Sequence, residues 1–211
     1  MDYQKEIASQ LLEIGAFRFN VDKPFKWTSG WYSPVYCDTR LSLSYHLLRK
    51  LIIDNFVQLI KAECPDVELI AGVATGAIAQ AGIIADKLEL PMVYVRSEAK
   101  SHGLGNKIEG TFKKGQKVVV IEDVISTGDS SFKAVESLKQ AELKVLGLLS
   151  IYSYDFEIAK KTFVNNNIFQ KNITNFETLL NLALEKGRVT QNELKIIQEW
   201  QKNPSQWLKN T

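Results

Sequence analysis

The sequence of 211 residues contains little cysteine and histidine, two of each, and its charges almost cancel to a formal net charge of +2. Cys37 and Cys64 lack the spacing of metal ligands, and two cysteines do not make the disulfide framework of a small secreted domain. Neither half carries a dense basic block, so we expect no binding to nucleic acid or to a membrane surface. The amino terminus lacks a basic segment followed by an apolar one, so we expect no export signal and a cytoplasmic protein.

A long uncharged run, residues 69–85, has nearly the length of a membrane span. It contains three glycines, a threonine and a glutamine, which favour a strand, a tight turn and a helix instead. The hydrophobic share of 45% and the charged share of 24% are ordinary for a soluble globular protein. Because there is no internal repeat, low-complexity linker or domain boundary, we expect residues 1–211 to form a single domain.

The most informative stretch is residues 118–130, with the sequence VVVIEDVISTGDS. Its four apolar, mostly β-branched residues predict a strand that is buried on both faces, as in a parallel sheet. Glu122 and Asp123 follow where this strand is expected to end, and small residues with a glycine then open an amphipathic helix. Such a helix start lets backbone N–H groups approach a phosphate closely. The stretch therefore predicts a ligand site at the carboxyl edge of an α/β sheet.

Each residue of this stretch also has an ordinary structural explanation. Ser126 or Thr127 could be a helix N-cap, and Asp129 could stabilise the first helical turn. The two carboxylates could lie at a solvated strand end. One residue at a time, these explanations are the better ones, but the complete pattern is more specific and favours the phosphate site.

Strand and helix patterns alternate around this stretch, which predicts an α/β fold with a right-handed parallel sheet. Strands are expected at residues 17–19, 68–73, 91–95, 118–121, 144–152 and 168–173. Helices are expected at residues 3–14, 44–62, 78–88, 132–138, 156–163, 175–185 and 191–202. The turn at residues 74–77 lies at a carboxyl edge too and could offer backbone N–H groups to a second phosphate.

Residues 24–38 are dense in aromatic and turn residues, which predicts a hairpin or flap. Two interpretations stay open for its side chains. The aromatic rings could pack on the core, or Trp27, Trp31 and Tyr32 could lie beside a planar base.

Residues 96–110 form a long, charged connection with three glycines. Loops of this length in compact domains are often lids. Arg96, Lys100, His102 and Lys107 could clamp an anion as such a lid closes. A solvated hairpin is the alternative, because two glutamates offset much of the positive charge, but the neighbouring phosphate motif favours the lid.

Four segments of the chain, in this order, resemble the orotate phosphoribosyltransferases of the type I phosphoribosyltransferase superfamily. They are residues 28–40, 72–79, 96–110 and 118–130. The last segment indicates the superfamily, while the loop sequence KSHGLGN followed by IEG is more discriminating. The resemblance covers nearly the whole chain. It implies a mostly parallel sheet flanked by helices, with an N-terminal flap or hood and a flexible lid loop.

The resemblance also implies a reaction, in which orotate and phosphoribosyl pyrophosphate give orotidine 5′-monophosphate and pyrophosphate in pyrimidine biosynthesis. Mg²⁺ is expected to bind mainly through phosphoribosyl pyrophosphate, with no separate metal site built from protein side chains. Family members are typically homodimers in which the lid of each subunit reaches into the site of its neighbour.

Site residues follow from the resemblance by motif position. Arg96, Lys100 and His102 would contact the pyrophosphate, and Lys100, His102 and Asp123 are the expected catalytic residues. Glu122 and Asp123 would bind the ribose hydroxyls, directly or through Mg²⁺. Residues 127–130 would hold the 5′-phosphate, and Ser126 would touch orotate. The substrate-binding positions in this motif are Glu122, Asp123, Val124, Ile125, Ser126, Thr127, Gly128, Asp129 and Ser130.

The residue types suit this chemistry. Displacing pyrophosphate from the anomeric carbon makes the ribose ring positive while the leaving group gathers negative charge. Carboxylates stabilise the first charge, and Mg²⁺ with basic side chains stabilises the second. A closed lid would also keep water from hydrolysing the activated sugar.

The sequence departs from the family pattern at the residues expected to bind the orotate base. Many members carry a lysine at the flap positions that Thr28 and Tyr32 occupy here, and several carry an arginine in the stretch that reads YSYDF here, residues 152–156. Lys26, or backbone N–H groups of residues 28–33, is therefore expected to bind the orotate carboxylate.

Two other functions would suit the same fold. One is transfer to another base such as a purine or xanthine. The other is a regulator that senses phosphoribosyl pyrophosphate and binds nucleic acid. The regulator would need a basic face or a recognition domain, and neither is visible.

Overall fold

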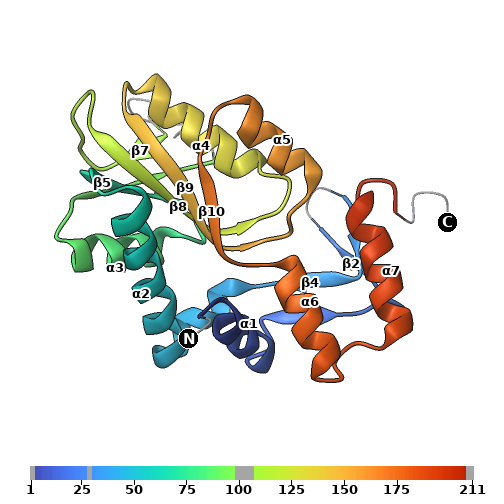
Figure 1. The fold of residues 1–211 in the computed structure, drawn as a ribbon. Helices are drawn as coiled ribbons and strands as arrows, with labels where there is room; N and C mark the ends of the chain where they lie inside the picture. Colours follow the sequence, from blue (N-terminus) through green and yellow to red (C-terminus); the bar gives the residue numbers. More distant parts are fainter. Residues whose placement is uncertain (1–2, 28–29, 98–106, 208–211) are drawn as a thin grey trace.

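The computed structural model describes residues 3–27, 30–97 and 107–207, and its centre is a six-stranded sheet with helices on both faces (Figure 1). In spatial order the strands are β10 (Gln170–Asn175), β9 (Lys144–Ser153), β8 (Lys117–Ile125), β5 (Leu69–Val73), β6 (Met92–Val95) and β7 (Ile108–Glu109). Neighbouring strands pair in parallel except β6 and β7, which are antiparallel. The predicted α/β fold with a mostly parallel sheet is confirmed.

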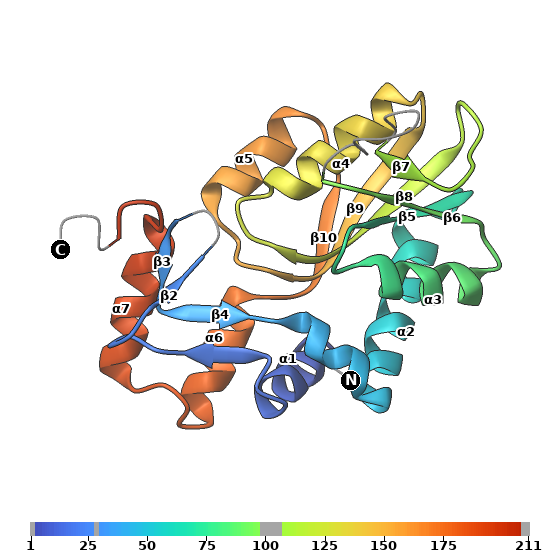
Figure 2. The same cartoon turned by 180° about the vertical axis from the view of Figure 1, so that it is seen from behind.

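Helices cover both faces of the sheet because β8 buries alternate side chains on opposite sides. The helices around the sheet are α2 (His46–Glu63), α3 (Ile78–Leu88), α4 (Asp129–Gln140) and α5 (Glu157–Asn165). Val118 and Val120 share a buried cluster with residues of α4 and α5, whereas Val119 and Ile121 share one with residues of α2 and α3. Figure 2 shows these two pairs of helices on opposite sides of the sheet. Burial on both faces explains the continuous apolar run.

The uncharged run at residues 69–85 forms β5, a turn and most of α3, as predicted. Throughout the part of the chain that the structure describes, no helix is both long enough and apolar enough to cross a membrane.

The two ends of the chain pack together below the sheet in Figure 1 and form what we call the hood. The hood consists of α1 (Tyr3–Glu13), β1 (Phe17–Phe19), β2 (Phe25–Lys26), β3 (Tyr32–Ser33), β4 (Val35–Cys37), α6 (Phe176–Glu185) and α7 (Gln191–Lys202). Helix α1 packs against α6, β1 pairs antiparallel with β4, and β2 pairs antiparallel with β3. The predicted hairpin is therefore present as β2 and β3. A short 3₁₀ helix, η1 (Thr39–Ser44), leads from the hood to α2.

Aromatic side chains of the hairpin pack on the core of the hood. The ring centroid of Trp27 lies 5.0 Å from that of Tyr154 and 5.9 Å from that of Trp200, which is fully buried on α7. Trp31 also packs against the core, whereas Tyr32 is 39% exposed. Trp27 and Trp31 therefore pack on the core, and Trp27 also lines a cleft, so a planar base beside it stays a prediction.

Strand β8 is longer than its apolar run. We expected Glu122 and Asp123 to follow the strand, but it continues to Ile125 because β9 pairs with it as far as Ser153. This expectation was wrong, since pairing with a distant strand leaves no trace in a local apolar pattern. Consecutive residues of a strand point to opposite faces, so the two carboxylates lie on different sides of the sheet.

Candidate functional site

Asp123 lies against the turn that follows β5. A Cβ atom added to Gly76 would overlap the Asp123 carboxylate, so this close approach depends on a glycine. The backbone N–H of Val124 donates a hydrogen bond to Asp123 Oδ1 at 2.9 Å. The half-buried Asp123 carboxylate and the turn at residues 74–77 therefore meet at the carboxyl edge of the sheet.

Glu122 points the other way, toward α4, and is buried. Ser131 Oγ donates a hydrogen bond to Glu122 Oε2 at 2.9 Å, and the backbone N–H of Asp123 donates one to Oε1 at 3.0 Å. Burial, and then the negative charge of Asp123, raises the pKa of Glu122 well above its usual range. Asp123 is thus the more accessible of the two carboxylates, and Glu122 joins β8 to the first turn of α4.

The start of α4 has the features of an anion site. The N-cap is Gly128, with a φ of +83° and no side-chain cap hydrogen bond, so the N-cap explanation for Ser126 and Thr127 was wrong. Gly128 has no side chain to cap the first backbone N–H groups of the helix, which lie at the positive end of its dipole. A Cβ on Gly128 would also lie 3.0 Å from the Phe163 ring and 3.2 Å from the Ala159 side chain on α5, which leaves little room for another residue.

A cleft of about 490 Å³ separates the hood from this helix start. Its lining residues are Lys26, Trp27, Tyr36, Cys37, Val124, Ser126, Thr127, Asp129, Ser130 and Tyr154. The structure thus brings Lys26 to the same cleft as five positions of the predicted substrate-binding motif. The Lys26 Nζ atom lies 5.9 Å from the centroid of the Tyr32 ring.

A second cleft, of about 340 Å³, shares Asp129 and Ser130 with the first and continues along the sheet edge. Its other lining residues are Val73, Ala74, Val95, Arg96, Ser97, Lys107, Lys133, Ala134 and Ser137. Three of these side chains are cationic, and they surround the carboxyl ends of β5 and β6. The Arg96 guanidinium also forms an ion pair with Glu109, with Nη1 and Oε1 at 3.4 Å. A polyanion placed across both clefts would run from the start of α4 to these cations.

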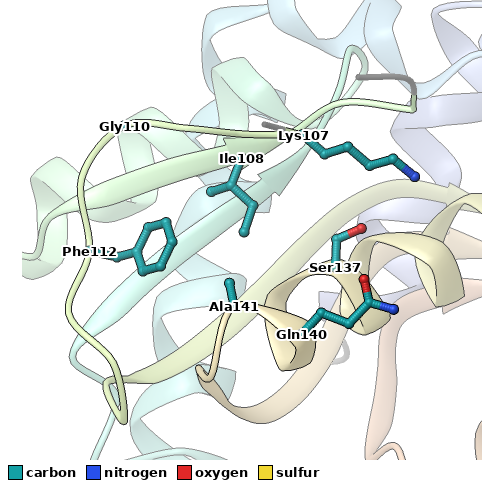
Figure 3. A pocket seen from close by; sticks show the side chains of 7 residues that line it. All are labelled: Lys107, Ile108, Gly110, Phe112, Ser137, Gln140 and Ala141. Atoms are coloured by element: carbon teal, nitrogen blue, oxygen red, sulfur yellow. The ribbon is translucent and has the colours of Figure 1, made fainter. Parts of the chain in front are cut away.

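A third cavity, of about 390 Å³, lies behind the second and shares Lys107 and Ser137 with it. Figure 3 shows Ile108 and Phe112 facing α4 across the cavity. The remaining residues around it are Gly110, Gln140 and Ala141. The two shared residues show that this cavity adjoins the second cleft.

The predicted lid begins and ends as a hairpin. β6 and β7 pair Tyr94 with Glu109 and Val95 with Ile108. The backbone N–H of Arg96 donates a hydrogen bond to the Lys107 carbonyl at 2.8 Å. The predicted catalytic residues Lys100 and His102 lie outside the described residues.

Comparison with known proteins identifies the family. Residues 43–176 match the family model of the phosphoribosyl transferase domain. The orotate phosphoribosyltransferase of Cytophaga hutchinsonii is 49% identical over 209 residues, which cover 99% of this chain and 100% of that protein. This chain belongs to the orotate phosphoribosyltransferase family.

Solved structures agree with this family. The orotate phosphoribosyltransferase of Aeropyrum pernix superimposes with a TM-score of 0.75 at 28% identity, over 87% of this chain and 99% of that chain. UMP synthase of Leishmania donovani gives a TM-score of 0.78 at 27% identity over 94% of this chain, which spans 42% of that longer chain. The type I phosphoribosyltransferase fold and its orotate branch are thus shown by sequence and structure together.

Sequence reasoning missed three residues of the orotate phosphoribosyltransferase cleft: Tyr36, Cys37 and Tyr154. The Tyr154 hydroxyl accepts a hydrogen bond from the backbone N–H of Cys37 at 3.0 Å, which joins the hood to the strand end of β9. Burial, followed by the charges of Asp123 and Asp38, raises the pKa of the Cys37 thiol. The sequence did contain a signal for Tyr154, because this residue lies in the segment where several family members carry an arginine.

Proposed function

We propose that this protein transfers the phosphoribosyl group of phosphoribosyl pyrophosphate to orotate, which yields orotidine 5′-monophosphate and pyrophosphate. The observation that carries the proposal is the cleft between the hood and the start of α4. It combines a glycine helix start suited to a phosphate with an aromatic wall and one lysine, in a chain 49% identical to an orotate phosphoribosyltransferase.

The 5′-phosphate is assigned to residues 127–130, where uncapped N–H groups and the helix dipole attract an anion. Val124 and Ile125 lead from the strand into this loop, and Ser126 lines the cleft beside the base. Asp123 is assigned to the ribose hydroxyls, where its negative charge stabilises the positive ring of the transition state.

The pyrophosphate is assigned to the second cleft. Arg96 lines this cleft, and Lys100 and His102 would join it from the lid. These cations would stabilise the negative charge that the leaving group gathers. Closing the lid would also exclude water from the reacting ribose.

A magnesium ion fits this site as a companion of the substrate. Among residues 3–27, 30–97 and 107–207, no three or more His, Cys, Asp or Glu side chains form a metal-binding group. Mg²⁺ is commonly held by one or two carboxylates together with substrate phosphates, and Asp123 is the half-buried carboxylate that would serve. When bound, Mg²⁺ would neutralise charge on the pyrophosphate group.

Orotate is assigned to the hood end of the first cleft. Lys26 is the one cation among the described residues that line this cleft, so it is the side chain proposed to pair with the orotate carboxylate. Trp27 and Tyr154 would supply apolar and aromatic surface for the planar ring.

A turnover assay with Mg²⁺ and phosphoribosyl pyrophosphate tests the proposal. Orotate, hypoxanthine, adenine and xanthine are compared as acceptors under the same conditions. We expect the highest kcat/KM with orotate. A preference for one of the purines would reject the assignment of the base while keeping the phosphoribosyl chemistry.

We propose a homodimer with shared active sites as the working form. Tyr45 and Leu47, at the start of α2, are 48% and 76% exposed beside a surface cavity of about 610 Å³. Exposed apolar side chains that gather at a cavity suit a subunit interface. A cytoplasmic location is also proposed, because both cysteines are free and buried, as suits a reducing compartment.

A further inference from the structure

One wall of the end of the cleft assigned to orotate comes from outside the part of the chain that matches the general phosphoribosyl transferase model, and the facing wall, Tyr154, lies inside that part. That match covers residues 43–176, whereas Lys26, Trp27 and Tyr36 precede it and α7 follows it. The phosphate-binding loop and Asp123 lie within it. Residues from both parts of the chain therefore line the end assigned to orotate, and the contacts of α7 indicate how its two walls are held together.

The last turn of α7 makes hydrogen bonds to both walls of the base-binding end. Trp200 Nε1 donates to the backbone carbonyl of Tyr32 at 3.0 Å, and Gln201 Nε2 donates to the backbone carbonyl of Tyr154 at 3.1 Å. Tyr32 pairs directly with Lys26 across the β2–β3 hairpin. Trp200 thus holds β3, the strand that pairs with Lys26, and its neighbour Gln201 holds Tyr154 on the facing wall.

The Trp200 ring lies one layer behind the cleft. Its centroid is 5.9 Å from that of Trp27 and 6.0 Å from that of Tyr154, and both of these residues line the cleft. Trp200 itself is fully buried and is not among the lining residues. It therefore contacts the walls from behind without reaching the substrate position.

The hairpin that carries Lys26 needs such a support. β2 and β3 contain two residues each, and a hairpin of this size is not stable on its own. The indole hydrogen bond and the aromatic packing around it fix the hairpin on α7. Removing the indole N–H would leave the Tyr32 carbonyl without this donor and would loosen the strand that pairs with Lys26.

We propose that Trp200 and Gln201 are positioning residues that set the shape of the orotate-binding end of the cleft. The inference rests on the proposed function, which supplies the base, and adds that the C-terminal helix determines the affinity for it. Because α7 donates these bonds to the base-binding walls and not to the phosphate loop, their loss should weaken orotate binding selectively.

Three variants test this inference. Trp200→Phe keeps an aromatic ring and removes the N–H donor. Gln201→Met removes the amide donor while keeping length and helix propensity. Gln198→Met makes the same exchange at an exposed position of the same helix and is the matched control. Steady-state kinetics give kcat and separate KM values for orotate and phosphoribosyl pyrophosphate, and thermal unfolding reports on folding.

We expect the KM for orotate to rise about fivefold or more in Trp200→Phe and Gln201→Met, as for the loss of a partly buried hydrogen bond. The KM for phosphoribosyl pyrophosphate should stay within about twofold of wild type. Gln198→Met should match wild type. If both KM values rise in proportion, or neither rises, the inference is wrong. Wild-type turnover with orotate is measured first in the same assay and tests the proposed function separately. If Trp200→Phe does not fold, Gln201→Met decides alone.

Discussion

At the scale of single residues, Asp123 is the side chain on which the proposed chemistry depends most. Asp123→Asn removes the charge next to the position proposed for the ribose but keeps the size of the side chain, so we expect kcat to fall about a hundredfold or more with the fold intact. Asp66→Asn is the control, because Asp66 is exposed and its ion pair with Lys117, at 3.0 Å, is of the surface kind that contributes little. Near wild-type turnover in Asp123→Asn would show that the motif has been assigned wrongly.

Gly76 is expected to act through Asp123. Gly76→Ala would place a methyl group where the Asp123 carboxylate lies, so the carboxylate must move and kcat should fall. In an Asp123→Asn background the same exchange should cost much less, because the group it displaces has already lost its charge. Gly82→Ala is the matched control, since a Cβ there would meet only the Met92 sulfur at an ordinary 3.6 Å. Equal losses in both backgrounds would mean that Gly76 serves the turn and not the carboxylate.

Glu122 should make stability depend on pH. Burial and the charge of Asp123 raise its pKa in the native state above the ordinary 4.5, so the native protein keeps a proton that the unfolded chain loses as the pH rises. The free energy of unfolding should therefore decrease above about pH 4.5, by at most about 1.4 kcal/mol per pH unit, up to the native pKa. Glu122→Gln cannot ionise and should lack this decrease. Urea unfolding of both proteins from about pH 4 to pH 8 measures the difference, and a constant difference would contradict the prediction.

At the scale of elements, local patterns predicted most of the fold. The strands β5, β6 and β9 and the helices α2 to α7 occur within a few residues of their expected positions, because each has an apolar pattern of its own. The two-residue strand β7 and the last four residues of β8 were missed. Both exist through pairing with strands that are distant in sequence or across a long loop, and a local pattern does not contain that information.

The site divides in the same way. The helix start after β8, to which phosphate is assigned, could be predicted because its small residues and glycine are contiguous in sequence. The hood end of the first cleft, to which orotate is assigned, was only partly predictable, because its lining comes from β2, β4 and the residue after β9. Hydrogen bonds from α7 hold two of these segments. The only sequence signal for Tyr154 was that its segment, residues 152–156, lacks the arginine that several family members carry there. Contacts between the two ends of the chain cannot be read from either end alone.

The hairpin of β2 and β3 gives an element-scale prediction for the base. Lys26→Ala removes the one cation among the described residues of the first cleft, so we expect the KM for orotate to rise about tenfold or more while kcat changes little. Lys23→Ala is the control, because Lys23 is exposed, precedes the hairpin and is not among the lining residues of that cleft. An unchanged KM for orotate would show that Lys26 does not bind orotate. Backbone N–H groups of residues 28–33 would then be the expected donors.

At the scale of the whole molecule, the sheet provides the edge to which the phosphoribosyl group is assigned, and the two chain ends form the hood on the other side of the first cleft (Figure 1). The family resemblance implies that the lid of each site comes from the partner subunit. Lys100 and His102 are expected to act on the substrate of the partner subunit. An intramolecular lid is the alternative, and the two arrangements differ in how pairs of inactive subunits behave when they are mixed.

The last prediction uses Lys100→Ala and Asp123→Asn, each nearly inactive alone, mixed under conditions that allow subunit exchange. If sites are shared, every mixed dimer has one site with both lesions and one site with neither. About half of a random mixture is mixed dimers, so activity should recover to roughly a quarter of wild type, provided that each site works independently. With an intramolecular lid every site keeps one lesion and the mixture stays inactive. Exchange is verified with two different affinity tags, and an absence of recovery after verified exchange would reject the shared-site homodimer.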